Sequence, residues 1–465
     1  MDLLLTHGYC LQDDAHERAV QKPYPPLGLL YLSSHLKQRG FDVVVADPTF
    51  QTFDELRRTI ERERPPVVGL YATLLTRRRV LEVMRLCKSL GSIVVLGGPE
   101  PGPHAEQYLA RGADVIVAGE GEHVLEELLP HLARNGPTRL GEIRGVIYRE
   151  EDGNTVRTPA PPQLRNLDAQ PFPDRAAIDV GRYVDHWRRH HGMGSVSLIT
   201  GRGCPFTCAW CSHAVFGFSH RQRSASNVAD EVEDILARYR PDMLWYADDV
   251  FTMHRRWFFA YAAELERRGL RIPFETISRE DCLDEAVVEK LAAMGCSRLW
   301  IGSESGSQRV LDRMTRRTDA ARVREMVRLL GRHGIGTRLF IMLGYEGEEL
   351  SDLEATVDHL KEANPDVFLT TLAYPIRGTA YHDEVASRVV PLKPWEEGSD
   401  RETTVAGRHS RRFYSFATRW MVNEVAWHRA RSTRPRRYGR MAKTFLNARI
   451  GRLGMRVTER EVEHG

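Results

Sequence analysis

The sequence predicts an α/β protein with a doubly wound parallel sheet, then a partial (β/α)6 barrel, then a helical C-terminal cap. Three observations support this fold class. Short β-branched runs alternate with helical stretches over the first 150 residues, the alternation resumes near residue 195, and it stops near Val390. Strands that alternate with helices of this length form parallel βαβ units. We therefore expect domains at 1–150 and 195–388, a basic helical region at 389–465, and a linker at 151–194.

The first domain has the pattern of a Rossmann-like sheet. Its expected strands are Leu3–Leu5, Val43–Ala46, Val67–Leu70, Ile93–Leu96 and Val115–Val117. Its expected helices are Gly28–Lys37, Phe53–Arg64, Arg78–Leu90, His104–Arg111 and Glu122–Ala133. Glycines follow the fourth and fifth strands, at Gly97–Gly98 and at Gly119 and Gly121. Ligands of such sheets bind at the carboxyl ends of the strands, where small residues let them approach the backbone. The proline-rich stretch from Asn154 to Arg175 then predicts the linker.

The second domain repeats the alternation six times. Its expected strands are Ser195–Thr200, Met243–Ala247, Phe274–Ile277, Arg298–Ile301, Thr337–Leu343 and Val367–Ala373. Its expected helices are Val228–Tyr239, Trp257–Arg268, Glu285–Met294, Ala320–His333 and Asp352–Lys361. Six units are too few for an eightfold barrel, so a partial barrel is predicted.

Composition narrows the class of protein. Of the 465 residues, 42% are hydrophobic and 28% are charged, and the formal net charge is only +3, which excludes a mainly disordered chain and gives no reason to expect nucleic acid as a partner. No apolar run approaches the roughly 18 residues of a membrane span, so we expect a cytoplasmic protein. Residues 401–465 are basic, with aromatic residues interleaved. We expect these residues to form a helical cap, with an RNA-binding surface as the alternative.

Three cysteines stand close together directly after the first expected barrel strand. Cys204, Cys208 and Cys211 have the spacing C-x3-C-x2-C. Three thiolates on one loop can each hold one iron of a [4Fe–4S] cluster and leave the fourth iron without a protein ligand. The alternative is a zinc site in which His213 is the fourth ligand.

At these cysteines the chain resembles the radical SAM superfamily. The resemblance implies that the open iron binds S-adenosylmethionine (SAM), whose cleavage yields a 5′-deoxyadenosyl radical. It also implies a set of cofactor-binding residues. Trp210 stands just before the last cysteine, and the others stand at the ends of successive strands: Asp248, Asp249, Ser278, Arg279, Glu304 and Gly344. Relatives usually read G-x-P-G-E after the fifth strand, and Tyr345-Glu346 departs from that pattern.

The first domain resembles the cobalamin-binding domain of B12-type radical SAM enzymes. The resemblance is carried by Pro25–Gly28, Gly97–Pro99 and Gly119–Glu122. The D-x-H-x-x-G loop that supplies a histidine to cobalt is absent, and Asp14–Ala19, which comes near it, is interpreted as a polar loop. Two alternatives stay open: the domain binds cobalamin, or it serves as a scaffold without it.

Further segments resemble the radical SAM diol-dehydratases of apramycin (aminoglycoside) biosynthesis. They are Cys211–Gly217, Tyr246–Phe251 and Ala373–Thr379. This resemblance implies dehydration of a vicinal diol in an amino sugar such as paromamine, with Asp248, Asp249, Glu346 and Tyr374 as acid/base candidates. The alternatives are a cobalamin-dependent C-methyltransferase and an RNA-modifying enzyme.

The predicted partners follow from that chemistry. We expect an amino-sugar substrate and an electron donor such as flavodoxin or ferredoxin. A reductase would act on a keto product. Neither a membrane nor nucleic acid is expected.

Overall fold

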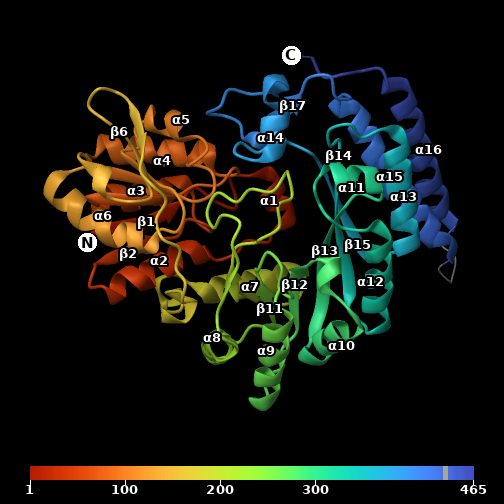
Figure 1. The fold of residues 1–465 in the computed structure, drawn as a ribbon, viewed down its shortest axis with the longest axis horizontal. Coiled ribbons are helices and arrows are strands. Elements are labelled where there is room, and N and C mark those ends of the chain that lie inside the picture. The colour runs from red at the N-terminus through yellow and green to blue at the C-terminus, as the bar shows by residue number, and fades with distance from the viewer. Residues whose placement is uncertain (433–437, 465) are drawn as a thin grey trace. The chain divides into compact units, whose positions relative to one another are not determined.

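The computed structural model describes residues 1–432 and 438–464 and divides the chain into two compact units (Figure 1). The first unit comprises Met1–Pro205, Ser212–Asp248 and Lys393–Arg401. The second comprises Phe206–Cys211, Asp249–Leu392 and Glu402–Gly465. This division does not follow chain order, and the domain boundaries expected from the sequence stay predictions.

The first unit is built on a seven-stranded sheet of order β2-β1-β3-β4-β5-β6-β7. Its parallel strands are β1 (Leu3–His7), β2 (Val43–Ala46), β3 (Val67–Tyr71), β4 (Ile93–Gly97) and β5 (Val115–Val117). The antiparallel strands β6 (Val146–Arg149) and β7 (Thr155–Arg157) complete it. The helices that belong to this unit are α1 (Ala15–Val20), α2 (Leu27–Gln38), α3 (Phe53–Glu63), α4 (Arg77–Ser89), α5 (Ala105–Leu109), α6 (Glu122–Asn135), α7 (Val180–His191) and α8 (Ala225–Tyr239).

Both faces of this sheet are buried. Along β1, Leu3 and Leu5 pack into one apolar cluster with α2 and α6, whereas Leu4 packs into another with α3 and α4. Successive side chains of a strand point to opposite faces, so a run of leucines supplies both cores at once. This arrangement confirms the predicted doubly wound sheet.

The structure differs from the prediction in the stretch expected to be a linker. It contains β7 and α7. Strand β7 has only three residues, which is too short to show a period of two. Helix α7 buries Tyr183, Val184 and Trp187 on one face and is otherwise rich in Arg and His. The helix is therefore amphipathic, although its overall composition is polar.

The expected barrel strands are all present. In the first unit, β8 (Ser195–Leu198) pairs in parallel with β11 (Met243–Tyr246), and the short strands β9 (Gly201–Arg202) and β10 (Arg221–Gln222) form a hairpin pair. In the second unit, four parallel strands lie in sequence order: β12 (Phe274–Ser278), β13 (Cys296–Glu304), β14 (Gly336–Leu343) and β15 (Val367–Leu372). The helices of the second unit up to β15 are α9 (Arg255–Arg267), α10 (Glu285–Met294), α11 (Gln308–Arg313), α12 (Ala320–Arg332) and α13 (Leu350–Ala363).

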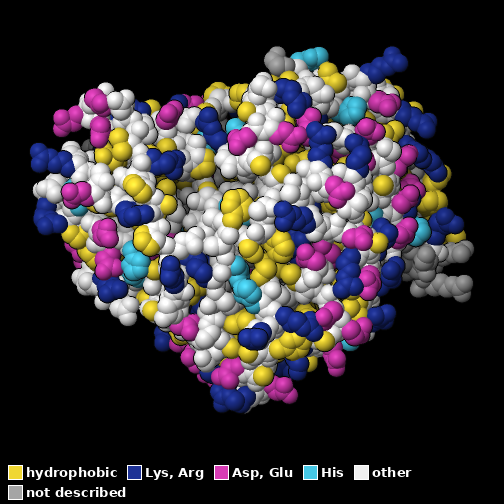
Figure 2. All heavy atoms as spheres, in the orientation of Figure 1, with side chains coloured by type: hydrophobic (Ala, Val, Ile, Leu, Met, Phe, Trp, Pro, Cys, Tyr) yellow, Lys and Arg dark blue, Asp and Glu magenta, His cyan; other side chains and the backbone are white. Residues whose placement is uncertain are grey.

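The C-terminal region is helical, as predicted. After α14 (Ala380–Val385) and the antiparallel pair β16 (Val389–Pro391) and β17 (Thr403–Val405), the chain forms α15 (Arg411–Ser432) and α16 (Tyr438–Thr458). Helix α15 buries Phe413, Trp420 and Val425 and packs against α13 and α16. Residues 433–437 and 465 of the predicted helical region lie outside the described residues. Over the face shown in Figure 2, Lys and Arg side chains are interspersed with Asp and Glu.

Among the described helices, none combines the length and the apolar character that crossing a bilayer requires.

A buried ion-pair network fastens the 393–401 segment inside the first unit. The guanidinium of Arg77, at the start of α4, pairs with Glu100 and lies 3.1 Å from Asp400. It also donates to the carbonyls of Trp395 and Gly398 and stacks over the Trp395 ring at 4.7 Å. Arg77 is only 3% exposed, so its charge depends on these partners.

We predict that Arg77→Ala lowers the free energy of unfolding by about 3–5 kcal/mol, because Glu100 stays buried and loses its arginine. Arg78→Ala is the control, since the neighbouring Arg78 side chain is exposed and pairs only at the surface with Glu82. Urea unfolding followed by circular dichroism measures both variants. Equal unfolding free energies for the two would contradict the prediction.

Candidate functional site

The three cysteines lie on a loop without helix or strand that follows β9. Cys204, Cys208 and Cys211 are each half-buried, so the loop is neither packed away in the core nor fully solvated. Burial raises the pKa of the Cys208 thiol, although Arg279 acts to lower it. A donor set of three thiolates in one short loop fits an iron–sulfur cluster with one open iron.

Two buried carboxylates hold the start of this loop. Arg202, two residues before Cys204, lies 2.8 Å from Glu120 and 2.7 Å from Glu122. Glu120 also pairs with Arg221 at 2.6 Å, which fixes the partner strand β10. The Gly119–Glu122 motif, predicted to form a ligand-binding loop, therefore also determines where the cysteine loop begins.

Gly203 is required by the geometry at this point. Its φ of +83° lies in the left-handed region, and a Cβ placed on it would lie 3.0 Å from the Cβ of Phe216. Any larger residue would push the loop away from the 216–219 turn. The glycine that precedes Cys204 is thus a structural part of the loop.

Arg279 holds the middle of the loop. It follows β12, is 3% exposed, pairs with Asp281 at 2.8 Å and donates to the carbonyls of Arg316 and Arg317. Its guanidinium stacks over the Phe206 ring at 3.7 Å and lies 4.0 Å from Cys208 Sγ. We predicted Arg279 as a SAM contact, and the structure places it directly against the cysteine loop. Ser278 beside it is buried and shares a hydrogen bond with Thr252.

Two acidic side chains are buried at the ends of the next strands. Glu304 ends β13 with φ +59°, and burial together with the charge of Glu280 raises its pKa to about 8. Glu348 follows β14 and accepts a hydrogen bond of 2.6 Å from the Gly344 N–H. Burial raises the pKa of Glu348 to about 8 as well, although this hydrogen bond acts to lower it. Both carboxyl groups therefore carry a proton over much of the neutral range.

Gly344 occupies a tight position after β14. Its φ is +72°, and a Cβ there would approach Leu372 Cδ1 to 2.7 Å. Glu348 is not among the site residues predicted from the sequence, because a buried acid and a solvated loop acid look alike in a sequence. The N–H bond from Gly344 is what distinguishes them.

The remaining predicted site residues have different surroundings. Trp210 packs on an apolar cluster of the second unit with Tyr345 and Tyr381. Glu346 pairs with Arg388 at 3.0 Å, and Tyr374, just after β15, is half-buried.

The adjacent Asp248 and Asp249 belong to different units. Asp248 is buried, and its carboxylate accepts hydrogen bonds from the Thr200 N–H, the Thr200 hydroxyl and the Gly201 N–H at 2.8–3.0 Å. These bonds fix the turn that leads from β8 into β9. Asp249 is exposed.

A cavity of about 610 Å³ opens at the carboxyl ends of β1, β3, β4 and β5 in the first unit. Its wall includes the start of α2, the glycine pair Gly97–Gly98, the Gly119–Glu122 loop, Arg202 and Phe216. A Cβ placed on Gly28 or Gly97 would meet nothing within 4 Å, so both glycines leave open space where a ligand can approach the backbone. This position and this lining fit a large cofactor such as cobalamin.

The histidines near this cavity have other partners. His7 lines the wall, and its Nδ1 accepts the Tyr9 N–H while its Nε2 lies 3.1 Å from Asp47. In the Asp14–Ala19 segment, Asp14 caps the N-terminus of α1 by accepting two backbone N–H bonds. The interpretation of Asp14–Ala19 as a polar loop is therefore wrong, because Ala15–Val20 form helix α1. None of the residues of this helix is buried, so no apolar periodicity marks it in the sequence.

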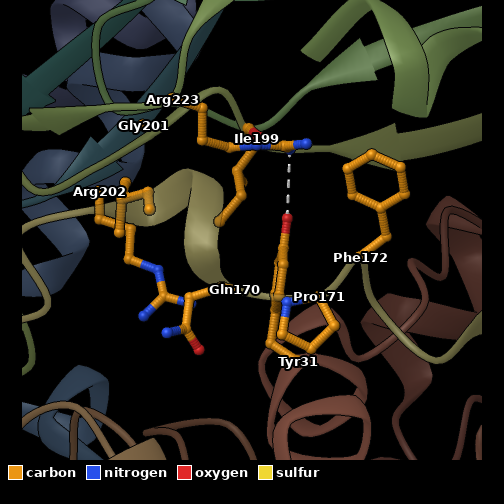
Figure 3. A pocket seen from close by; sticks show the side chains of 9 residues that line it. Tyr31, Gln170, Pro171, Phe172, Ile199, Gly201, Arg202 and Arg223 are labelled. Atoms are coloured by element: carbon orange, nitrogen blue, oxygen red, sulfur yellow. Dashed lines mark hydrogen bonds between the residues drawn. The ribbon is translucent and has the colours of Figure 1, made fainter. Parts of the chain in front are cut away.

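A second, much smaller cavity lies between α2 and the β8–β10 region. Figure 3 shows Tyr31 pointing toward Arg223, whose guanidinium lies 3.5 Å from the Tyr31 hydroxyl. Its volume of about 10 Å³ has room for about one water molecule and for no substrate.

Two parts of this chain match models of known protein families. Residues 18–129 match the B12 binding domain, and residues 198–360 match the radical SAM superfamily. An uncharacterized methyltransferase from Pyrococcus horikoshii is 26% identical over 405 residues, which span 85% of this chain and 86% of the relative.

Two solved structures show a similar fold. The cobalamin-dependent S-adenosylmethionine radical enzyme OxsB with aqua-cobalamin bound aligns with a TM-score of 0.78 and 18% identity, covering 97% of this chain and 72% of its own. The second is the radical S-adenosylmethionine methyltransferase TsrM from Kitasatospora setae, with cobalamin and a [4Fe–4S] cluster bound. It aligns with a TM-score of 0.69 and 21% identity, and the alignment covers 86% of this chain and 80% of TsrM.

We predict that Arg279→Lys reduces the iron bound per chain after anaerobic reconstitution at least twofold. A lysine cannot stack flat on Phe206 while it holds Asp281 and two carbonyls. Arg271→Lys is the control, because Arg271 is exposed and donates to the Ala293 carbonyl, far from the cysteine loop in sequence. Iron analysis and the visible absorption spectrum measure the effect, and wild-type iron content in Arg279→Lys would refute it.

Proposed function

This chain carries a B12-binding domain followed by a radical SAM domain, and from that premise we propose that it is a cobalamin-dependent C-methyltransferase acting on a small molecule. One observation carries the proposal. Arg202 lines the large cavity of the first unit and stands two residues before Cys204. The same buried side chain thus borders the space for one cofactor and sets the start of the loop for the other.

The cofactors would supply the two reactive groups, a radical and a methyl group. A [4Fe–4S] cluster with SAM supplies the radical that activates a carbon atom, and cobalamin supplies a transferable methyl group. The chain itself holds Cys204, Cys208 and Cys211 as three cluster ligands, which leaves one iron open for SAM. Arg202 and Arg279 are both buried and keep that loop in place through ion pairs.

Substrate-side residues are proposed from the strand ends of the second unit. Ser278, Glu304 and Gly344 follow or end three neighbouring parallel strands, β12, β13 and β14. Sites of barrel-like sheets are built at such ends. Glu304 is buried and protonated at neutral pH, which suits it to donate a hydrogen bond to SAM or substrate. Trp210, Asp248 and Asp249 stay in the proposed set of SAM-binding residues.

The similar proteins support methyl transfer more than other reactions. The Pyrococcus horikoshii relative and the Kitasatospora setae structure are both named methyltransferases. A relative from Streptomyces wedmorensis, 24% identical over 420 residues, is named cytidylyl-2-hydroxyethylphosphonate methyltransferase. Only the Streptomyces wedmorensis relative is named with an acceptor, so we propose the type of reaction and leave the acceptor molecule to experiment.

Dehydration of a vicinal diol in an amino sugar is the second candidate. It is favoured by the buried acids Glu304 and Glu348, because a carboxyl group that keeps its proton near pH 7 can protonate a leaving hydroxyl. Of the acid/base residues predicted from the sequence, Asp249 and Tyr374 remain candidates for the base. The carboxylates of Asp248 and Glu346 are already used, in a turn and in an ion pair.

Product analysis separates the two candidates. The full chain would be reconstituted without oxygen with iron, sulfide and hydroxocobalamin, then incubated with SAM, a reductant and paromamine. Methylation predicts a product heavier by CH2, with S-adenosylhomocysteine and 5′-deoxyadenosine formed in equal amounts, because one SAM donates the methyl group and another the radical. A product lighter by water, with no S-adenosylhomocysteine, would overturn methyl transfer in favour of the dehydratase.

A separate prediction concerns the binding of cobalamin in the large cavity. Gly97→Val places two methyl groups in the open space at the cavity wall, so we expect the Kd for cobalamin to rise at least tenfold while the iron content stays the same. Gly102→Val is the matched control, because Gly102 also has open space around it and does not line the cavity. Equilibrium dialysis with cobalt analysis measures both. Equal affinities for the two variants would show that cobalamin does not bind in this cavity.

A further inference from the structure

Two histidines and a glutamate converge between two helices of the first unit, and none of the three lines the large cavity. His35 lies on α2, and His123 and Glu126 lie one turn apart on α6. One ligand atom from each of the three side chains lies within 4.8 Å of the other two. Helices α2 and α6 pack side by side on the same face of the sheet, which brings the three side chains together.

The distances suit a tetrahedral metal ion. Glu126 Oε2 lies 3.2 Å from His35 Nε2 and 3.5 Å from His123 Nδ1. Ligands about 2.0–2.1 Å from a zinc ion are separated by about 3.3 Å along the edges of a tetrahedron. Both separations are therefore close to the spacing that one ion would impose.

The second nitrogen of His35 is held in the manner of a metal-bound imidazole. Its Nδ1 lies 2.9 Å from the Gln170 amide oxygen. With the Nδ1 proton donated to Gln170, Nε2 is left with a lone pair that faces Glu126. His35 is buried, so this ring orientation is fixed by packing as well as by the hydrogen bond.

The charge of the cluster also favours a cation. Glu126 supplies a carboxyl group whose Oε2 faces both imidazoles. One positive group competes: Arg39 Nε lies 3.5 Å from the same Glu126 oxygen. Arg39 is half-exposed and on a flexible side chain, so it can move to the other carboxylate oxygen or into solvent.

We propose that His35, His123 and Glu126 form a binding site for a divalent transition-metal ion that fastens α2 to α6. His123 is 48% exposed, which leaves a path for the ion and room for a water ligand. The N-terminal ends of both helices border the large cavity, through Leu27 and Glu122. A bound ion would thus stiffen two of the helices that shape the cavity without contacting its contents.

The test uses Zn²⁺ alone as the probe, on the full chain with its iron–sulfur cluster reconstituted so that the cysteines are occupied. After incubation with a small excess of zinc and gel filtration, we expect one zinc per wild-type chain. His123→Ala and Glu126→Gln should each lose it, with at least a tenfold weaker Kd by competition with a chelator. X-ray absorption at the zinc edge should show nitrogen and oxygen ligands without sulfur.

Matched variants keep the result interpretable. His131→Ala and Glu127→Gln lie on the same helix and outside the cluster, and both should retain the zinc. The variants use the more exposed His123 because the buried His35 is needed for packing. Equal zinc content in wild type and His123→Ala, or zinc ligated by sulfur, would overturn the proposal. Iron and cobalt contents, measured in the same samples, report separately on the proposed function.

Discussion

The cysteine loop depends on buried arginines, because it has no regular secondary structure to hold its shape. Arg202 binds the loop's beginning to two glutamates, and Arg279 covers Phe206 and approaches Cys208. A buried guanidinium is costly unless several acceptors surround it, so each arginine can occupy few positions. Each part of the loop is thus held in place by side chains of its own unit.

Much of the architecture could be predicted from local patterns. Alternating apolar runs and helical stretches identified every parallel strand of both domains, because these strands are rich in β-branched and other apolar residues and alternate with helices. The three-residue strands β7, β16 and β17 pair antiparallel and lie outside the alternation of strands and helices, so the pattern that identified the equally short β5 does not mark them. Helix α7 was missed because Arg and His dominate its exposed side, although its apolar residues recur at helical spacing.

The candidate site was predictable to the extent that its residues carry a motif. The cysteine spacing and the glycines at strand ends can be read from the sequence. The pairing of Glu120 with Arg202 cannot, because it joins residues 82 positions apart and no pattern in the sequence relates the two. The burial of Glu348 is equally invisible, since it results from the packing of segments that lie far apart in the chain. Residues that carry the chemistry can therefore be predicted from the sequence more readily than the residues that position them.

The return of residues 393–401 to the first unit has a consequence for how the protein is made. Arg77 and Asp400 meet although they are 323 positions apart, so the first unit lacks one of its buried partners until nearly the whole chain has left the ribosome. Domains usually fold in the order of their synthesis. Here the N-terminal sheet would have to wait, with Glu100 and Arg77 already paired, for the segment that covers them. Completion of the first unit thereby becomes a late event, coupled to synthesis of the second.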